Sequence, residues 1–180
     1  EGGKGKDVFV GTVGPDTISG GGGKDTIDGG GGDDTLDGGK GPDKIDGGSG
    51  IDTVSYATSS GSVKINLGKT KQKGGDAAGD KLKSIENVVG SDKNDKIVGN
   101  DADNVLDGAG GNDRLDGKGG KDTLIGGEGD DVFRYKKGYG VDTIADLGLG
   151  ADVVDITMKG VGKYKDLNAL MSEADGHVVI

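Results

Sequence analysis

Cysteine is absent from this 180-residue chain, which excludes a disulfide framework and thiolate metal sites. No apolar run is long enough to predict a transmembrane helix, and no secretory signal peptide is recognisable. The chain begins in mid-pattern at Glu1 and stops in an apolar run at Val178, Val179 and Ile180. We therefore expect it to be part of a longer protein.

Large apolar side chains are also scarce. Hydrophobic residues make up 30% of the chain and aromatic residues 3%, and tryptophan is absent. A large hydrophobic core is therefore not expected. Something else must offset a backbone folding entropy of roughly 1–2 kcal/mol per residue.

Glutamate is the rare acid, found only at Glu1, Glu86, Glu128 and Glu173, whereas aspartate is abundant. Because Asp is short and suits turns, its dominance places the acids in loops. The net charge of −10 argues against nucleic acid and anionic membranes as partners. It favours cations.

Glycine is abundant, with 42 residues, and it follows a nine-residue period. Residues 2–55 hold six copies of G-G-x-G-x-D-x-U-x, where U is apolar. The sixth residues are Asp7, Asp16, Asp25, Asp34, Asp43 and Asp52. The eighth residues are Phe9, Ile18, Ile27, Leu36, Ile45 and Val54.

A second array covers residues 90–134 in five copies, and two looser copies follow at 137–145 and 147–155. The sixth residues are Asp95, Asn104, Asp113, Asp122, Asp131, Asp142 and Asp152. We divide the chain into a first array (1–55), an interrupting strand and loop segment packed on the arrays (56–89), a second array (90–155) and a C-terminal capping segment (156–180).

The segments outside the arrays carry weaker signals. SVKINL (62–67) alternates polar and apolar residues and predicts a strand, 69–80 predicts a loop, and SIENVV (84–89) predicts a strand leading back into register. KDLNALMSEA (165–174) predicts a short amphipathic helix, and GHVVI (176–180) predicts a strand.

Each repeat combines a three-residue strand, x-U-x, with a six-residue turn. Two repeats, or 18 residues, complete one circuit, and successive circuits stack as parallel sheets about 4.8 Å apart. One apolar residue per repeat then faces inward. The repeat therefore predicts an all-β flattened solenoid.

Stacking aligns like charges. Asp7, Asp25 and Asp43 fall on one edge of the solenoid, and the intervening sixth residues fall on the other. A hard cation between two turns reverses this repulsion. Ca²⁺ takes roughly six to eight oxygens, so it could reach an Asp from each turn and carbonyls of the glycine-rich loops. Zinc would need His or Cys, and Mg²⁺ prefers a tighter octahedron, so Ca²⁺ fits best.

These nonapeptides, such as GGGGKDTID (20–28), resemble the RTX (repeats-in-toxin) hemolysin-type calcium-binding repeat. SIENVVGSDKNDKIVGNDADNVLDGAGGNDRLDG (84–117) is similar to the C-terminal domain of serralysin-type proteases and to the repeat modules of mannuronan epimerases. The resemblance implies a right-handed parallel β-roll with Ca²⁺ between stacked turns. It also implies export by a type I secretion apparatus through the parent protein.

The resemblance further implies that sixth-position side chains and turn carbonyls bind the ion. The side-chain ligands would be Asp7, Asp16, Asp25, Asp34, Asp43, Asp52, Asp95, Asn104, Asp113, Asp122, Asp131 and Asp142. The carbonyl ligands would lie at Gly20, Gly22, Gly29, Gly31, Gly38, Gly108, Gly110, Gly117 and Gly119.

Two further features affect the number of sites. Asn104 replaces an acid and should weaken two sites, with Asp101 or Asp103 as compensating ligands. Asp80 and Glu86 lie outside the repeats and are candidates for an additional Ca²⁺ site, although Glu86 could equally be a solvated strand residue. Pairing sixth residues 18 positions apart predicts about seven to nine bound Ca²⁺.

The sequence contains no catalytic constellation. It has no H-E-x-x-H and no G-x-S-x-G motif, and LGKT (67–70) lacks the earlier glycine of a phosphate loop. His177 is the only histidine. We expect a chain without enzymatic activity, whose parent could be a protease, lipase, epimerase, adhesin or toxin.

Two functions stay open. In the first, the chain is an extracellular, monomeric calcium module that is unfolded at low Ca²⁺ inside the cell and folds outside. In the second, it is an accessory module that binds an anionic polysaccharide such as alginate. The cations for the second would be Lys64, Lys69, Lys71, Lys73, Lys81, Lys83 and Lys93, unless they belong to a solvated loop.

Overall fold

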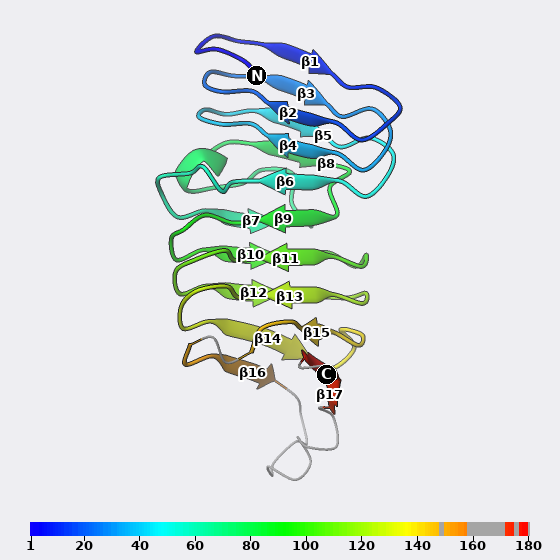
Figure 1. Ribbon diagram of the computed structural model, residues 1–180, viewed down its shortest axis with the longest axis vertical. Coiled ribbons are helices and arrows are strands. Elements are labelled where there is room, and N and C mark those ends of the chain that lie inside the picture. Colours follow the sequence, from blue (N-terminus) through cyan, green and yellow to red (C-terminus); the bar gives the residue numbers. More distant parts are fainter. Residues whose placement is uncertain (148–149, 158–171, 175–176, 180) are drawn as a thin grey trace.

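The computed structural model describes residues 1–147, 150–157, 172–174 and 177–179. Short strands stack in layers along one axis, with the N-terminus at one end and the β17–β18 hairpin at the other (Figure 1). All pairings between the repeat strands are parallel. The predicted parallel β-solenoid is therefore confirmed.

One face of the solenoid is a nine-stranded sheet that runs through both arrays. In spatial order its strands are β2 (Thr17–Ser19), β4 (Thr35–Asp37), β6 (Thr53–Ser55), β9 (Asn87–Val89), β11 (Val105–Asp107), β13 (Thr123–Ile125), β15 (Thr143–Ile144), β18 (His177–Val179) and β17 (Ser172–Ala174).

The opposite face is divided into two sheets. The first contains β1 (Val8–Val10), β3 (Thr26–Asp28), β5 (Lys44–Asp46) and β8 (Lys81–Lys83). The second contains β7 (Lys64–Asn66), β10 (Lys96–Val98), β12 (Arg114–Asp116), β14 (Val132–Lys136) and β16 (Val153–Thr157).

The nine-residue period sets both register and core. Strands two repeats apart pair residue for residue, as in Phe9 with Ile27 and Ile27 with Ile45. The middle residue of each strand points inward, so Ile27 and Ile45 are buried, while Phe9 in the terminal layer is only partly buried. The core thus takes one inward side chain from each repeat strand and has two facing columns, one from the nine-stranded sheet and one from the divided face.

The interrupting segment restores the stack by a different route. Between β7 and β8, residues 71–73 run antiparallel to both strands, through the bridges Lys64–Lys73 and Lys71–Lys81. The buried amide of Gln72 accepts a hydrogen bond from Asn66 N–H and donates one to Lys69 O. These contacts join the two sheets of the divided face.

Predictions for this segment hold in part. The strand expected at 62–67 is confirmed at β7. The strand expected at 84–89 is limited to β9, and the loop at 69–80 contains a 3₁₀ turn, η1 (Gly75–Ala77). Strand β8 was not predicted, because no repeat marks it.

The C-terminal prediction needs correction. Residues 165–171 of the expected helix lie outside the described residues, but residues 172–174 form strand β17, antiparallel to β18. The helix is therefore wrong over 172–174, because pairing with a neighbouring strand overrides local helix propensity. The expected strand at 176–180 is confirmed over 177–179. No helix among the described residues has the length and apolarity needed to cross a membrane.

Candidate metal centre

The turns are built to let neighbouring layers approach closely. Gly21 has φ +85°, and a Cβ at this residue would lie 2.7 Å from Gly3 O in the adjacent layer. A side chain here would be strained by the backbone conformation and would collide with the next turn. Glycine thus allows the backbones of successive turns to pack against each other.

The sixth residues form ladders along both edges of the solenoid. In each step the backbone N–H of one sixth residue donates to the side-chain oxygen of the sixth residue one circuit later, at 2.7–2.9 Å. The pairs are Asp7/Asp25, Asp25/Asp43, Asp16/Asp34, Asp34/Asp52, Asp95/Asp113, Asn104/Asp122 and Asp113/Asp131. These are the seven pairs expected from the sequence.

That bond uses one carboxylate oxygen, Oδ1. Asp142 Oδ1 accepts Asp122 N–H in the same way, at 3.2 Å. In eight of the sixth residues the other oxygen, Oδ2, is buried and has no hydrogen-bond partner. The residues are Asp25, Asp34, Asp43, Asp52, Asp113, Asp122, Asp131 and Asp142. A buried charged oxygen without a partner costs free energy, so each of these atoms calls for a ligand.

Carbonyl oxygens converge on the same places. A Cβ built on Gly20 would lie 2.7 Å from Gly38 O and 2.8 Å from Asp25 Oδ2, so the two oxygens border one small cradle. Within the described part of the chain, none of the nine glycine carbonyls expected as ligands accepts a hydrogen bond. A hard cation, which binds carboxylate and carbonyl oxygens together, fits this donor set.

Burial also shifts the acidity of these groups. Desolvation raises the pKa to about 7 for Asp113 and Asp122, and to about 6 for Asp43 and Asp142. Hydrogen bonds from the preceding layer oppose the shift, and neighbouring carboxylates add to it. A cation in the turn would favour the ionised form of each group.

Asp80 and Glu86 extend the two ladders across the interrupting segment. Asp43 N–H donates to Asp80 Oδ1 at 2.8 Å, and Asp52 N–H donates to Glu86 Oε2 at 2.9 Å. Asp80 differs from the repeat acids because its Oδ2 accepts a hydrogen bond from the buried Tyr56 hydroxyl at 3.0 Å. Sequence analysis missed Tyr56, which lies outside the repeats.

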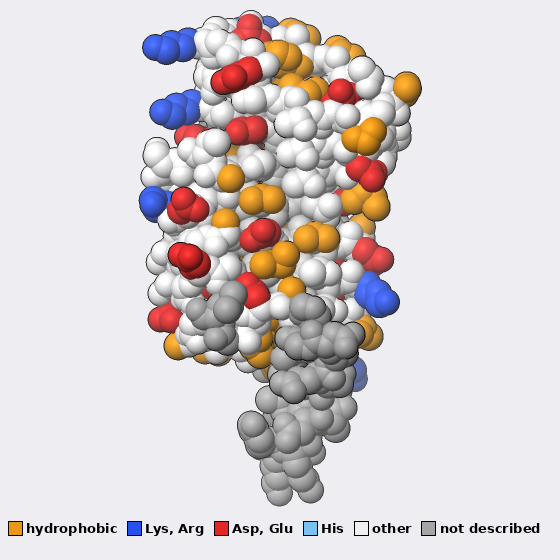
Figure 2. Space-filling view, viewed as in Figure 1, with side chains coloured by type: hydrophobic (Ala, Val, Ile, Leu, Met, Phe, Trp, Pro, Cys, Tyr) orange, Lys and Arg blue, Asp and Glu red, His pale blue; other side chains and the backbone are white. Residues whose placement is uncertain are grey.

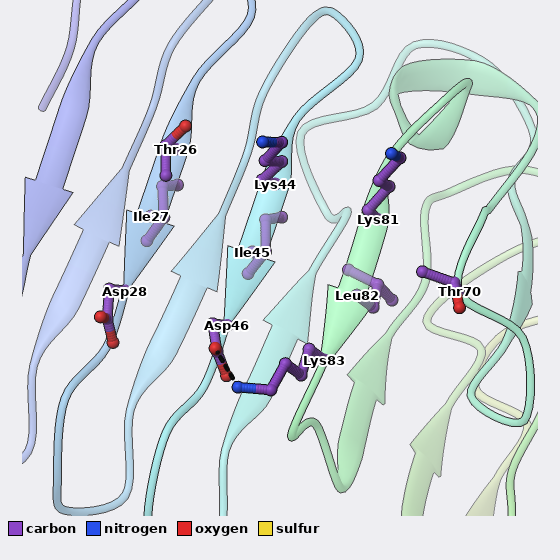
Figure 3. Close-up of a pocket in the computed structure, with 10 residues that line it drawn as sticks. All are labelled: Thr26, Ile27, Asp28, Lys44, Ile45, Asp46, Thr70, Lys81, Leu82 and Lys83. Atoms are coloured by element: carbon purple, nitrogen blue, oxygen red, sulfur yellow. Dashed lines mark hydrogen bonds and ion pairs between the residues drawn. The ribbon is translucent and has the colours of Figure 1, made fainter.

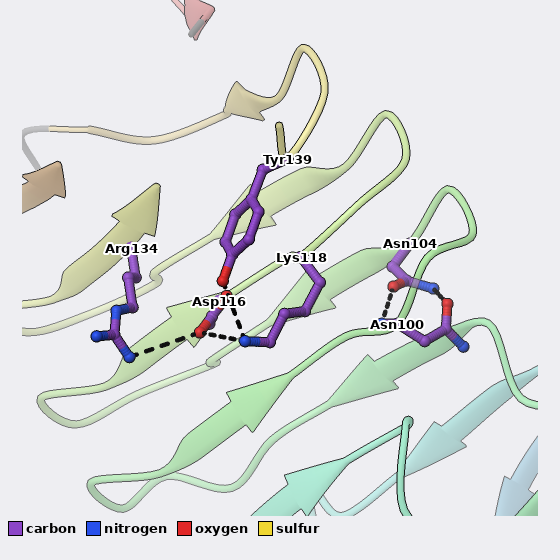
Figure 4. A network of polar contacts seen from close by, with 6 residues as sticks. All are labelled: Asn100, Asn104, Asp116, Lys118, Arg134 and Tyr139. Carbon is purple, nitrogen blue, oxygen red and sulfur yellow. Dashed lines mark hydrogen bonds and ion pairs between the residues drawn. The ribbon is translucent and has the colours of Figure 1, made fainter. Parts of the chain in front are cut away.

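The second array begins with two rungs that have protein partners. Asp95 accepts hydrogen bonds from Val63 N–H at one oxygen and from Ser91 N–H at the other. The Asn104 amide donates to Glu86 O at 2.8 Å. It also accepts from Asn100 N–H at 2.9 Å, as Figure 4 shows. Asn104 therefore bonds to its own turn and to the layer before it.

A further ladder was not anticipated. Fifth-position side chains accept the N–H of the fifth residue one circuit later, as in Asn94 to Asn112 at 3.1 Å and Asn112 to Asp130 at 3.2 Å. Asp33 and Asp103 make the same bond. The frequent Asp or Asn at position five was the available signal. These side chains connect successive turns on the outer surface of the solenoid.

Acidic side chains do not gather in larger groups here. Among the described residues, no set of three or more His, Cys, Asp or Glu side chains could hold a metal ion. A cation between turns would therefore rely on one or two carboxylates per rung and take its other oxygens from the backbone. The assignment of individual ligands stays a prediction.

Stacked turns that present buried carboxylate oxygens beside backbone carbonyls define a calcium-binding repeat protein. The family model of the RTX calcium-binding nonapeptide repeat matches four copies, at residues 1–36, 19–54, 84–115 and 107–141. The chain belongs to this family. A search of curated proteins found no match. The chain is thus a calcium-binding RTX module.

Proposed function

We propose that Ca²⁺ is the switch that folds this chain. The observation that carries the proposal is the set of eight buried Oδ2 atoms without a partner. Ionising Asp113 in the folded chain, against a pKa of about 7, costs about 4 kcal/mol relative to the ordinary value of 3.8. Asp122 has a similar pKa, and Asp43 and Asp142, with pKa values of about 6, carry smaller costs. Together these costs are comparable to the roughly 5–15 kcal/mol that keeps a typical domain folded. Calcium at the turns would remove this penalty.

The module would then serve a secreted parent protein. At the low free Ca²⁺ inside a bacterium, the acidic, glycine-rich chain would stay unfolded and fit for type I export. Outside the cell, Ca²⁺ binding would supply the folding free energy. We assign about seven to nine ions to the monomer by the geometry of the ladder. The proposal gives the chain itself no catalytic role.

Circular dichroism tests the switch. The chain in EDTA should give a coil spectrum, and millimolar Ca²⁺ should produce a β spectrum in a saturable titration. Mg²⁺ at the same concentration should not, because it holds its water and demands a rigid octahedron. A complete β spectrum in EDTA would refute the proposal.

A second candidate function is the binding of an anionic polysaccharide. It is favoured by a row of exposed cations on the divided face, at positions linked by strand pairing: Lys44, Lys81, Lys71, Lys73, Lys64, Lys96 and Arg114. Figure 3 shows Lys44 and Lys81 on neighbouring strands of a 330 Å³ trough, where Lys83 instead pairs with Asp46. Like charges opposite one another destabilise a sheet, so the row needs an explanation.

The row continues across the interrupting segment. A 240 Å³ groove there is lined by Lys64, Lys69, Lys71, Lys73 and Lys96. Within the described residues, no member of the row forms an ion pair. On the face seen in Figure 2, by contrast, Lys and Arg appear only near the rim. An extended polyanion bound along this row of cations would lie away from the sixth-position aspartates at the two edges of the solenoid.

Binding of calcium-loaded protein to oligouronates tests this candidate. Changing Lys81, Lys64 and Lys96 together to Gln should weaken binding at least tenfold. The matched control changes Lys4, Lys6 and Lys121, which lie outside the row, and should have little effect. Equal losses of affinity in both variants would show that binding depends only on the net charge of the protein. The row would then not be a binding site.

A further inference from the structure

The turns occur in two backbone states, distinguished by their second residue. In eight turns this residue has φ between +69° and +100°. The residues are Gly21, Gly30, Gly39, Gly48, Ala109, Lys118, Gly127 and Gly138. The sixth residues of the same eight turns are the ones whose Oδ2 has no partner. We call these turns open.

Four described turns have a second residue outside the positive-φ region, and we call them closed. In each, the second N–H donates to the sixth side chain of its own turn. The bonds are Gly3 to Asp7 at 3.1 Å, Thr12 to Asp16 at 2.6 Å, Ser91 to Asp95 at 2.6 Å and Asn100 to Asn104 at 2.9 Å. The oxygen that an open turn leaves without a partner is bonded in a closed one.

The two states redirect the same N–H group. In open turns it does not donate to the sixth residue, and in three of them it has another acceptor. Gly39 N–H donates to Asp37, Ala109 N–H to Asp107, and Gly127 N–H to Asp146, at 2.7–2.9 Å. Rotation of the peptide at position two therefore decides whether Oδ2 receives a proton donor from the turn.

Side chains reinforce the closed state. The hydroxyls of Thr12 and Ser91 donate to Asp16 and Asp95 at 3.0 Å. A Cβ, and a β-branched side chain most of all, disfavours positive φ at position two, whereas glycine permits it. Ala109 and Lys118 adopt positive φ in spite of this cost. The identity of the second residue thus biases the state of its turn.

We infer that calcium is held only at open turns, one ion to each free Oδ2, and that the second residue biases this state without fixing it, since Gly3 lies in a closed turn and Ala109 and Lys118 lie in open ones. This inference rests on the calcium-binding function proposed above. The eight open turns fall into two groups, Asp25 to Asp52 and Asp113 to Asp142. Between them, the rungs at Asp80, Asp95 and Asn104 have protein donors.

The segment between the groups is stabilised in another way. Residues 56–98 supply nine of the eighteen buried hydrophobic side chains among the described residues, about three times the density of the first array. They include Tyr56, Val63, Ile65 and Leu82. The inference therefore assigns two calcium-binding groups to the roll, separated by a metal-free segment that relies on apolar burial and internal hydrogen bonds.

Counting bound ions by equilibrium dialysis or native mass spectrometry tests the inference. The unaltered chain should bind eight Ca²⁺, one for each unpartnered Oδ2. Ser91→Gly should open its turn and add one ion at Asp95. The matched control, Ser49→Gly, changes an exposed third residue whose hydroxyl makes no hydrogen bond within the described chain, and should leave the count unchanged.

A second pair of variants tests the inference by loss of an ion, so it does not require a substitution to create a new site. Asp95→Asn should retain all the ions, whereas Asp113→Asn should lose at least one. Loss of an ion in Asp95→Asn, or an unchanged count in Ser91→Gly, would overturn the inference while leaving the calcium function intact. An unaltered chain that binds no Ca²⁺ would overturn the proposed function itself.

Discussion

At the scale of single residues, the main feature is a buried aspartate whose negative charge has no protein group to balance it. Asp34 shows this arrangement. Its Oδ1 accepts Asp16 N–H from the layer before, and its Oδ2 has no partner. The nearby backbone contributes carbonyls, so the missing contribution is positive charge. Each such residue makes the folded state depend on a cation.

Asp34→Ala should therefore raise the Ca²⁺ concentration needed for half-folding severalfold. The change removes a carboxylate and leaves Asp16 N–H without its acceptor, which costs about 1–3 kcal/mol. A calcium titration followed by circular dichroism measures the midpoint. Asp28→Ala alters an exposed ninth-position residue and should leave the midpoint unchanged. Equal midpoint shifts would mean that burial of Asp34 is not what matters.

Backbone conformation gives a second residue-scale prediction. Ala109 occupies an open turn at φ +69°, a conformation that costs an L-residue about 1–2 kcal/mol. Ala109→Gly relieves this strain but loosens the unfolded chain, so we expect a net gain of about 0.5–1 kcal/mol. Urea unfolding at saturating Ca²⁺ measures it. Ala57→Gly, at an exposed position without positive φ, should be neutral or destabilising.

At the scale of elements, the strands and turns of the arrays could be predicted because their information is local. Each nonapeptide carries its own inward residue and its own turn glycines, and the 18-residue circuit fixes the pairing. The pairs Asp7/Asp25 and Asp113/Asp131 were found this way. Asp80 and Glu86 were proposed separately, as acids outside the repeats that could form an additional Ca²⁺ site, and the sequence did not show that they extend the ladders.

What the sequence did not reveal depends on contacts between distant residues. Strand β8 pairs with β5 across 37 positions, and residues 71–73 bridge two sheets, with no periodicity to mark either. Strand β17 was expected to be helical over 172–174, because the pattern does not show its antiparallel partner. The Tyr56–Asp80 bond likewise joins residues that no motif relates.

The Tyr56 contact yields a prediction at this scale. Tyr56→Phe keeps the buried ring but leaves Asp80 Oδ2 without its donor, which should cost about 1–3 kcal/mol. Urea unfolding at saturating Ca²⁺ measures the loss. Tyr139→Phe removes a hydroxyl that bonds the partly exposed Lys118 (Figure 4), and should cost less than about 0.5 kcal/mol. A larger loss in the control would contradict the role given to Asp80.

At the scale of the whole molecule, the chain has a net charge of −10 and a core to which each repeat strand contributes one inward side chain. Its apolar burial is repeated layer by layer through the arrays and is denser over residues 56–98. In such a solenoid, stability is a sum of terms between neighbouring layers. Cations that link the layers would therefore act on the whole roll at once.

The raised pKa values predict how the calcium-free chain responds to pH. Burial raises the pKa of Asp43 and Asp142 to about 6 and of Asp80, Asp113 and Asp122 to about 7, above the ordinary 3.8. Between these values the folded form binds more protons than the unfolded form. The calcium-free fold is therefore least disfavoured near pH 4 and loses stability as pH rises towards 7.

Circular dichroism of calcium-stripped protein at pH 4.5 and 7.5 measures this effect. We expect more β structure at pH 4.5, with saturating Ca²⁺ restoring it at pH 7.5. More β structure at pH 7.5 than at pH 4.5 without calcium would show that the buried carboxyl groups do not oppose folding.

Small-angle X-ray scattering with and without calcium tests the central claim most directly, because it measures the dimensions of the whole chain. In EDTA at pH 7.5, the account predicts a radius of gyration near that of an unfolded chain of this length, about 45 Å. With millimolar Ca²⁺ it predicts a compact rod, only slightly larger than the roughly 16 Å of a globular domain. Equal compact dimensions in both conditions would contradict the account.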